Sequence, residues 1–533
     1  FRFFWCLNSP RVKELSANHG IMEILSNAGG DRVVKTNPVL IVLFGATGDL
    51  AQRKLYPSFF RLFRSGALAE RFAVIGTARR EWSDAHFRDV VSDSIQSFQP
   101  TDAEKAAFLS HFYYRAHDVS DVEHYVHLKE LADKLDDKYD LEQNRMYYLA
   151  MAPQFFGPIV THLKGQQIVT DKGFNRVVIE KPFGMDYASA EKLNNEITKV
   201  FPEEDIFRID HYLGKEMIQN ILAVRLTNPF LEPSWNREYI ENVQITFSEE
   251  LGVEERGGYY DHSGALKDMV QNHILQVLSL LAMEPLASVS DANIQTAKIK
   301  ALNDVRVYSP EEVRENFVRA QYAAGRLGDD GFVAYQEEPN VASDSRTETF
   351  VAGKFMVDNP RWKGVPFYVR TGKRMTEKGT RVNIVFKKVP VNPFDAEKDV
   401  PANDLTIYIQ PTEGFALTMN RKEIGQGFNT QPIKLEYRHD SEMMENTPEA
   451  YERLTYDVIL GDATNFARWE EVAQSWRIID AIRETWDSDN EEIPKYAART
   501  MGPKEAFDLL KKENHEWVWT PDEWYRERGL LKG

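Results

Sequence analysis

The stretch VLIVLFGATGDLAQRKLYPSFFRLFRSG, from Val39 to Gly66, decides the fold. Its first six residues form the apolar, β-branched run of a buried strand, and the aromatic and leucine residues after Lys54 recur at helical spacing. Between them GATGDLA, Gly45 to Ala51, has the spacing G-x-x-G-x-x-A, a variant of the dinucleotide fingerprint. Glycine lets a ligand approach the backbone closely, and the following helix offers free N–H groups to a pyrophosphate. The stretch therefore predicts a strand, a tight turn and a helix around a dinucleotide.

Three further apolar runs, with helical patterns between the first two, lie at Phe72–Ala78, Arg145–Met151 and Arg176–Pro182. Strands that alternate with helices predict a parallel sheet with helices on both faces. We therefore expect a Rossmann-type, doubly wound α/β domain over residues 38–210. Residues 1–37 show no sustained hydrophobic period and are expected to form a flexible N-terminal extension.

After Leu226 the pattern changes to segments in which polar and apolar residues alternate, as in strands with one solvated face. These segments are YIENVQITFSE, PFYVRTG, RVNIVFKKV, NDLTIYIQP and FALTMNR. They predict an α+β domain over residues 211–533, with a large, mostly antiparallel sheet and helices such as one over about residues 263–282. A sheet of this kind offers a broad face for self-association.

The composition excludes several classes of protein. A hydrophobic fraction of 42% and a charged fraction of 28% are ordinary for a soluble globular protein, and no run approaches the roughly 18 apolar residues of a membrane span. The net charge of −17 disfavours binding to nucleic acid or an anionic membrane, so local cations must hold any anionic substrate. A single cysteine, Cys6, excludes an intramolecular disulfide and is expected to be an inert thiol, which fits a reducing compartment such as the cytoplasm.

The residues after the second predicted strand indicate which dinucleotide binds. Where an NAD-binding protein usually has an acidic residue, this chain reads Gly76-Thr77-Ala78-Arg79-Arg80. Arginine accommodates the 2′-phosphate of NADP, which a carboxylate would repel. Two adjacent basic residues in a loop are more often simply solvated, but their position at the end of a strand favours a preference for NADP.

Two segments are the candidates for a reaction site. RIDHYLGKE, from Arg208 to Glu216, gathers five polar functional side chains and one glycine just before a predicted helix. A charged loop that caps a helix can have this composition. However, EKPFG, from Glu180 to Gly184, follows a predicted parallel strand, and ligands bind outside the carboxyl ends of such strands. Together the two segments predict a site outside the carboxyl ends of the parallel strands, with Lys181 beside the nicotinamide.

A third segment, GALKDMVQNHILQ, supplies a candidate base. It places Asp268 and His273 five residues apart in a predicted helix, which is about 140° around an α-helix, so a direct pair is not expected. Oxidation of an alcohol needs a base for the hydroxyl proton; histidine is the common choice, and a carboxylate orients it. A lone helical histidine more often has a structural hydrogen bond, but beside such a site His273 is the candidate base.

In their order and spacing these segments resemble the glucose-6-phosphate dehydrogenase family. The resemblance rests on GATGDLAQRKLYP, EKPFG, RIDHYLGKE, RGGYYDHSG with the following DMVQNH, and GVPFYVRTGK, and it covers about residues 38–480. It implies oxidation of D-glucose 6-phosphate to 6-phospho-D-glucono-1,5-lactone with reduction of NADP, the first step of the oxidative pentose phosphate pathway, without a metal. It also implies a homodimer or homotetramer that assembles through the C-terminal sheet.

The resemblance also implies roles for individual residues. His273 would be the general base and Asp210 the carboxylate that orients it. The implied substrate-binding residues are Lys181, His211, Tyr212, Lys215, Glu249, Asp268, Lys373, Lys378 and Gln410. The implied coenzyme-binding residues are Gly45, Thr47, Gly48, Asp49, Leu50, Lys54, Arg79, Tyr148 and Lys181. Some family members hold a second, structural NADP on basic residues, but the matching positions here read Gly379, Asn383 and Met501, which disfavours such a site.

Two other functions stay open at this point. One is an NADP-binding oxidoreductase that acts on another, unphosphorylated sugar, against which His211 and Lys215 argue. The other is a non-catalytic NADP-binding protein, against which the presence of both a base and an orienting acid argues.

Overall fold

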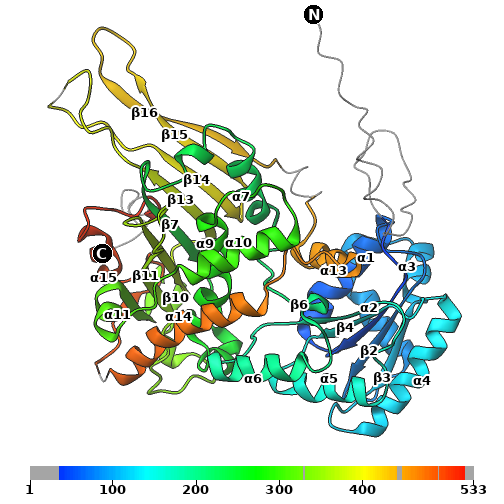
Figure 1. The fold of residues 1–533 in the computed structure, drawn as a ribbon. Helices are drawn as coiled ribbons and strands as arrows, with labels where there is room; N and C mark the ends of the chain where they lie inside the picture. Colours follow the sequence, from blue (N-terminus) through cyan, green and yellow to red (C-terminus); the bar gives the residue numbers. More distant parts are fainter. Residues whose placement is uncertain (1–34, 328–329, 396, 441–446, 490, 522–533) are drawn as a thin grey trace, which may run out of the picture.

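The computed structural model describes residues 35–327, 330–395, 397–440, 447–489 and 491–521 of the 533-residue chain. These residues fold around two sheets, one parallel and one mixed, which Figure 1 shows side by side with helices around each. The predicted flexible extension over residues 1–37 and Cys6 lie outside the described residues, except for residues 35–37. None of the described helices is long and apolar enough to cross a membrane.

The first sheet has six parallel strands in the order β3-β2-β1-β4-β5-β6, which confirms the predicted Rossmann-type domain. The strands are β1 (Val39–Phe44), β2 (Phe72–Ala78), β3 (Phe112–Ala116), β4 (Arg145–Leu149), β5 (Asn175–Ile179) and β6 (Ile206–Arg208). The helices are α1 (Tyr56–Arg64), α2 (Asp84–Ser94), α3 (Asp102–Leu109), α4 (Val122–Tyr139), α5 (Phe156–Gly165) and α6 (Tyr187–Ile197).

Both faces of this sheet are covered, which is why its strands are continuous apolar runs rather than alternating ones. Leu40 and Val42 pack into the core that includes α4, α5 and α6, whereas Ile41 and Leu43 pack into the core that includes α1, α2 and α3. A later helix, α13 (Ala450–Leu460), joins the second of these cores. The chain thus returns to the parallel sheet long after residue 210. The predicted domain boundary at that residue stays a prediction.

The second sheet has nine strands in the order β16-β15-β14-β13-β7-β12-β11-β8-β17, and only the β7–β12 and β8–β17 pairs are parallel. This confirms the predicted large, mostly antiparallel sheet. The strands are β7 (Ile240–Ser248), β8 (Phe317–Ala323), β11 (Phe350–Met356), β12 (Pro366–Gly372), β13 (Gly379–Phe386), β14 (Asp404–Gln410), β15 (Gly414–Lys422), β16 (Thr430–Arg438) and β17 (Lys495–Ala497), and β9 (Gly325–Leu327) and β10 (Asp330–Phe332) form a separate pair. The helices around it are α7 (Glu216–Leu226), α8 (Gly257–Tyr260), α9 (Leu275–Ala282), α10 (Asp291–Asn303), α11 (Pro310–Asn316), α14 (Trp469–Ser488) and α15 (Lys504–Lys511).

The expectation that these strands have one solvated face is wrong at the centre of the sheet. In β12, Phe367 and Val369 face the main core, and Tyr368 and Arg370 on the other face are also fully buried. The chain after β17 covers this second face: Tyr368 packs with α15, and the guanidinium of Arg370 lies 4.2 Å from the ring of Trp517. The alternation of polarity therefore reflects two different packing layers rather than solvent on one side.

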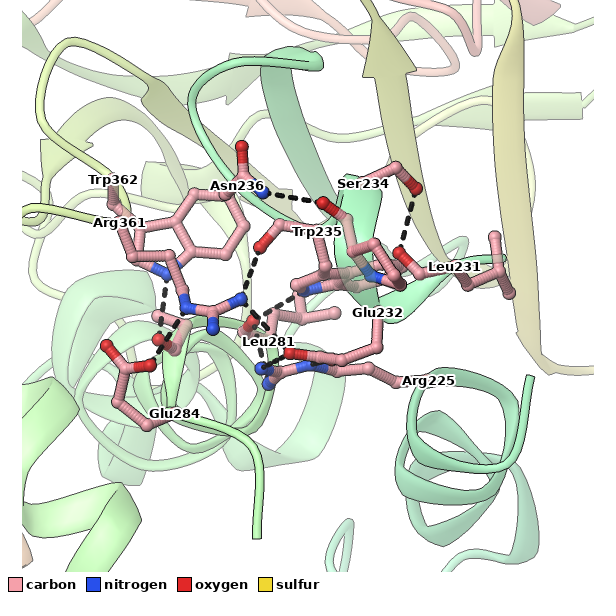
Figure 2. Close-up of polar contacts among 12 residues, drawn as sticks. Arg225, Leu231, Glu232, Ser234, Trp235, Asn236, Leu281, Glu284, Arg361 and Trp362 are labelled. Carbon is pink, nitrogen blue, oxygen red and sulfur yellow. Dashed lines mark hydrogen bonds and ion pairs between the residues drawn. The ribbon is translucent and has the colours of Figure 1, made fainter. Parts of the chain in front are cut away.

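A cluster of polar side chains around the buried Arg225 joins the far ends of α7 and α9 (Figure 2). Arg225, at the end of α7, donates to Glu232 at 2.8 Å and to the carbonyl of Leu281, at the end of α9, at 3.4 Å. Arg361 donates to Glu232 at 3.1 Å and to Glu284 at 3.0 Å. Because α7 begins at the candidate site and α9 continues the helix that carries part of it, these contacts hold two site-bearing helices together.

Candidate active site

The turn after β1 fits close contact with a dinucleotide. Gly45 has a φ of +92°, and a Cβ atom there would collide with the carbonyl oxygen of Ala150 after β4, so only glycine is accommodated. The Gly48 N–H donates to the Gly45 carbonyl at 2.9 Å, and a helical segment begins at Asp49 and continues into α1. The turn therefore lies against the sheet edge and directs the start of a helix toward it, as phosphate binding requires.

The other predicted coenzyme-binding residues lie around this turn or at neighbouring strand ends. Thr47 and Leu50 are half-buried in and beside the turn. Arg79 is exposed directly after β2. Lys54 forms a 3.0 Å ion pair with Glu449, which precedes α13.

Tyr148 differs from these residues because its hydroxyl already has a partner. It is buried at the end of β4 and donates a 2.7 Å hydrogen bond to Glu180, at the end of β5. Burial raises the pKa of Glu180 to about 7, although the hydrogen bond from Tyr148 and the nearby Lys181 both act to lower it.

Asp210 and His273, the predicted acid–base pair, are in direct contact. Asp210 follows β6 by two residues, and its Oδ1 lies 2.5 Å from Nδ1 of His273. Both side chains are buried. The Tyr212 N–H also donates to Asp210 Oδ1, at 2.9 Å, which fixes the carboxylate. The arrangement assigns the Nδ1 proton of His273 to this bond and leaves Nε2 to accept a proton.

The helix that carries His273 is not an α-helix at this point, which corrects the predicted 140° separation from Asp268. Residues Leu266–Ile274 form a π-helix, in which hydrogen bonds join residues five apart, so Asp268 and His273 are about one turn apart on one face. Both point to Lys181: its Nζ lies 3.2 Å from Asp268 Oδ1 and 3.0 Å from His273 Nε2.

The charges of this group follow from burial and from the contacts. Burial alone would raise the pKa of Asp210, but His273 outweighs it and the pKa is about 2. Burial lowers the pKa of His273, as does Lys181, while Asp210 and Asp268 raise it; the net shift is downward. Burial disfavours the charge on Lys181, yet Asp268 raises its pKa overall. At neutral pH the group therefore holds two carboxylates, one ammonium and a neutral imidazole.

The residues predicted to bind phosphate adjoin this group. The ring of His211 lies 4.8 Å from the ring of His273, edge to face. Tyr212 accepts a 3.1 Å hydrogen bond from Gln410 at the end of β14, and Lys215 Nζ lies 5.1 Å from the Tyr212 ring. Burial lowers the pKa of Lys215.

Three further predicted substrate-binding residues complete the surroundings. Lys373, just after β12, forms a 2.6 Å ion pair with Glu249, just after β7. Lys373 also acts on Asp268, whose pKa is strongly lowered by Lys181 and Lys373 against the effect of burial. Lys378 is exposed, and its charge contributes to the lowered pKa of Lys215. The structure thus gathers the predicted substrate-binding residues where the parallel sheet meets the mixed sheet.

Comparison with known proteins identifies the family to which the chain belongs. Two family models match it: "Glucose-6-phosphate dehydrogenase, NAD binding domain" over residues 42–220, and "Glucose-6-phosphate dehydrogenase, C-terminal domain" over residues 222–518. The chain belongs to the glucose-6-phosphate dehydrogenase family. It is 52% identical over 497 residues to the glucose-6-phosphate 1-dehydrogenase of Streptococcus pneumoniae, covering 93% of this chain and 100% of that protein. For the enzyme of Bacillus subtilis the identity is 51% over 488 residues, covering 91% and 99%.

Solved structures agree with this membership. A structure described as glucose-6-phosphate dehydrogenase in complex with its substrate glucose-6-phosphate matches with a TM-score of 0.84 and 34% identity, over 91% of this chain and all of that chain. The enzyme from Mycobacterium avium matches with a TM-score of 0.78 and 32% identity, over the same shares. This chain is thus an oxidoreductase of the glucose-6-phosphate dehydrogenase family with a nicotinamide-dinucleotide-binding domain.

The sequence assigned no role to Glu180 and Tyr451, which also belong to this part of the glucose-6-phosphate dehydrogenase fold. Tyr451, on α13, lies with its ring parallel to that of His211 at 6.2 Å, and its hydroxyl interacts with Glu180. Glu180 could have been suggested by its place next to Lys181 at a strand end. Tyr451 lies more than two hundred residues farther along the chain, and nothing in its local sequence marks it.

Asp210, His211 and His273 also offer potential metal-ligating atoms within 4.8 Å of one another. Two of these atoms, Oδ1 of Asp210 and Nδ1 of His273, already share a hydrogen bond of 2.5 Å.

Proposed function

We propose that this chain oxidises D-glucose 6-phosphate to 6-phospho-D-glucono-1,5-lactone and reduces NADP to NADPH. The observation that carries the proposal is the buried group in which His273 is bonded to Asp210 at 2.5 Å and faces Lys181 at 3.0 Å. A neutral buried histidine between a carboxylate and an ammonium is an arrangement for proton transfer, which favours an enzyme over a non-catalytic binding protein.

The proposed reaction assigns one task to each of these side chains. His273 Nε2 takes the proton of the hydroxyl on the anomeric carbon, and Asp210 stabilises the imidazolium that results. NADP held by the turn after β1 and by Arg79 would supply the hydride acceptor for that same carbon, and loss of the proton and the hydride would leave a carbonyl. Lys181, held by Asp268, donates a hydrogen bond to the reacting oxygen in place of its present bond to His273.

The proposed phosphate site directly follows Asp210 in the chain. His211, Tyr212 and Lys215 would bind the phosphate through charge-assisted hydrogen bonds, with Lys378 as a further cation. The remaining predicted ligands, Glu249, Lys373 and Gln410, would contact the sugar. The proximity of the His211 and His273 rings supports this arrangement, because it puts a phosphate ligand beside the base.

For the coenzyme we infer a preference for NADP over NAD. Arg79 is exposed at the end of β2, and no acidic residue stands beside it in the Ala78-Arg79-Arg80 sequence. The location we infer is the cytoplasm, because one cysteine in 533 residues suits a reducing compartment.

The test of the activity is the absorbance of NADPH after the chain is mixed with glucose 6-phosphate and NADP. We expect formation of NADPH, much less with unphosphorylated glucose, and less with NAD than with NADP. A flat trace from folded protein would overturn the proposal, and equal rates with glucose would remove the phosphate site from it.

We also infer a homodimer or homotetramer that forms through the mixed sheet. In the outer hairpin of this sheet, apolar residues lie opposite one another on one face: Phe415–Tyr437, Leu417–Leu435 and Met419–Ile433. Leu435 is 53% exposed and Tyr437 is 41% exposed, so this face is open to a second copy. Light scattering of the intact chain tests the inference: Leu435→Lys should lower the mass of the particle, and a monomeric wild type would refute it.

A further inference from the structure

The π-helix that carries Asp268 and His273 needs support at its start. π-helices are rare, and the first N–H groups of any helix have no partner within it. Here Glu348, two residues before β11, supplies the partners: its carbonyl accepts from the Ala265 N–H and its Oε1 accepts from the Leu266 N–H, each at 3.0 Å. A carboxylate at this end of a helix is also favoured by the helix dipole.

Glu348 is itself held by a second element. Its side chain is fully buried, and Arg483 on α14 donates to its Oε1 at 2.6 Å. Gly264, which precedes Ala265, leaves room for this contact, since a Cβ atom there would collide with the Glu348 carboxylate. A buried carboxylate without a cation would be costly, so Arg483 is what allows Glu348 to remain charged beside the helix.

We propose that Glu348 and Arg483 are positioning residues that hold the start of the π-helix, so that Asp268 and His273 meet Lys181 together. The inference rests on the proposed function of these three side chains. Asp268 is two residues from Leu266, whereas His273 is held separately by Asp210. Loss of the Glu348 contact should therefore release Asp268 from Lys181 first and leave His273 in place.

The pH dependence of kcat/KM reports this displacement. The charged or titratable groups that face Lys181 and His273 among the described residues include Asp210, Asp268, His211, Tyr212 and Tyr259. Asp268 raises the pKa of both Lys181 and His273. If Asp268 moves away, the pKa of Lys181 and the pKa of His273 both fall. The acid and alkaline limbs of the pH profile of kcat/KM then both move to lower pH.

Two substitutions that remove charges of opposite sign distinguish a positioning effect on the π-helix from a purely electrostatic effect of the ion pair. Glu348→Met removes a negative charge together with the acceptor of the Leu266 N–H, and Arg483→Met removes a positive charge. If the pair acted only through its charges, the limbs would move to lower pH in the first variant and to higher pH in the second. If it positions the π-helix, both variants move the limbs to lower pH. We expect kcat to fall by about 10–100-fold in both, with little change in KM for glucose 6-phosphate, and Arg483→Lys to restore most of the loss.

A matched control exists on α14, the helix that carries Arg483. Lys298 and Glu471 form a second buried ion pair, at 2.8 Å, that joins α10 to α14, and no hydrogen bond or ion pair is described between these two side chains and Leu266–Ile274. Glu471→Met and Lys298→Met should lower the melting temperature as much as the test variants do, yet leave both pH limbs unchanged. If Glu348→Met or Arg483→Met does not fold, Glu348→Asp is tested instead, because the shorter side chain keeps the charge but cannot reach Leu266.

The outcomes are distinct. Limbs that move in opposite directions, limbs that do not move, or control variants that move them as well would overturn the positioning role. Failure of the proposed function is seen separately, because wild-type protein would then produce no NADPH at any pH.

Discussion

Replacement of His273 by asparagine tests the centre of the proposed mechanism. The amide of asparagine can still donate a hydrogen bond to Asp210, so the buried carboxylate keeps a partner. It cannot take up a proton at neutral pH, however, and the hydroxyl proton of the substrate then has to leave to water. The substitution thus removes the base while it leaves the phosphate-binding residues in place.

The expected loss follows from the usual contribution of a positioned base. General base catalysis contributes about 10²–10⁴-fold, which corresponds to roughly 3–5 kcal/mol of activation free energy. The upper part of this range is favoured because His273 is fully buried and bonded to Asp210 at 2.5 Å, so the substitution removes a base that the fold holds in one position. Glucose 6-phosphate affinity should change little, since none of the phosphate ligands is altered.

The assay is steady-state formation of NADPH, with substrate affinity measured separately by calorimetry. A variant with near-normal kcat would refute the assignment of His273 as the base. A variant with normal kcat but weak substrate binding would make His273 a ligand instead. Asp210→Asn is the companion variant: if Asp210 orients the base, its loss should lower kcat as well, without an added effect in the double mutant.

Four further predictions concern the other parts of the site. Lys215→Thr should raise KM for glucose 6-phosphate by about 10–100-fold, because a hydrogen bond to a charged group is worth roughly 1.5–3 kcal/mol; an unchanged KM would exclude a phosphate role. Gly45→Ala should weaken NADP binding in a fluorescence titration, since its Cβ would meet the Ala150 carbonyl; unaltered binding would contradict the close approach of the turn. Arg79→Ala should raise KM for NADP but not for NAD, and a parallel rise in both would argue against recognition of the 2′-phosphate. In a pH profile, kcat/KM should fall on the acid side with a midpoint below 6.5, because the pKa of His273 is lowered from that value; a midpoint above 6.5 would point to another group.

Local sequence patterns predicted much of the fold. The run Val39–Phe44 and the run Phe72–Ala78 coincide with β1 and β2, because strands buried on both faces are continuous in their apolar character. The runs at Arg145 and Arg176 extend past the ends of β4 and β5, and the extra residues, among them Glu180, form part of the site edge. Periodicity could not separate these endings from the strands, since Glu180 is buried like the strand before it and the other extra residues are half-buried.

What local patterns could not predict depends on distant packing. The second covered face of β12 comes from α15 and Trp517, more than a hundred residues later in the chain. The π-helix at Leu266–Ile274 has the composition of an ordinary helix, and its start is held by a carboxylate from Glu348 that no spacing rule connects to it. For the same reason the sequence paired His273 with Asp210 only through the family resemblance, because Asp210 lies sixty-three residues earlier.

The net charge of the buried group suits the proposed proton transfer, although burial of charged side chains costs stability. At rest it contains the carboxylates of Asp210 and Asp268, the ammonium of Lys181 and a neutral His273, and thus one excess negative charge in a buried site. A buried net charge is unfavourable, since neither water nor a partner compensates it. When His273 takes the hydroxyl proton, the imidazolium supplies the missing positive charge and the group becomes neutral. The fold has therefore already placed the negative charge that the reaction needs, so that the side chains need not reorganise as the proton moves.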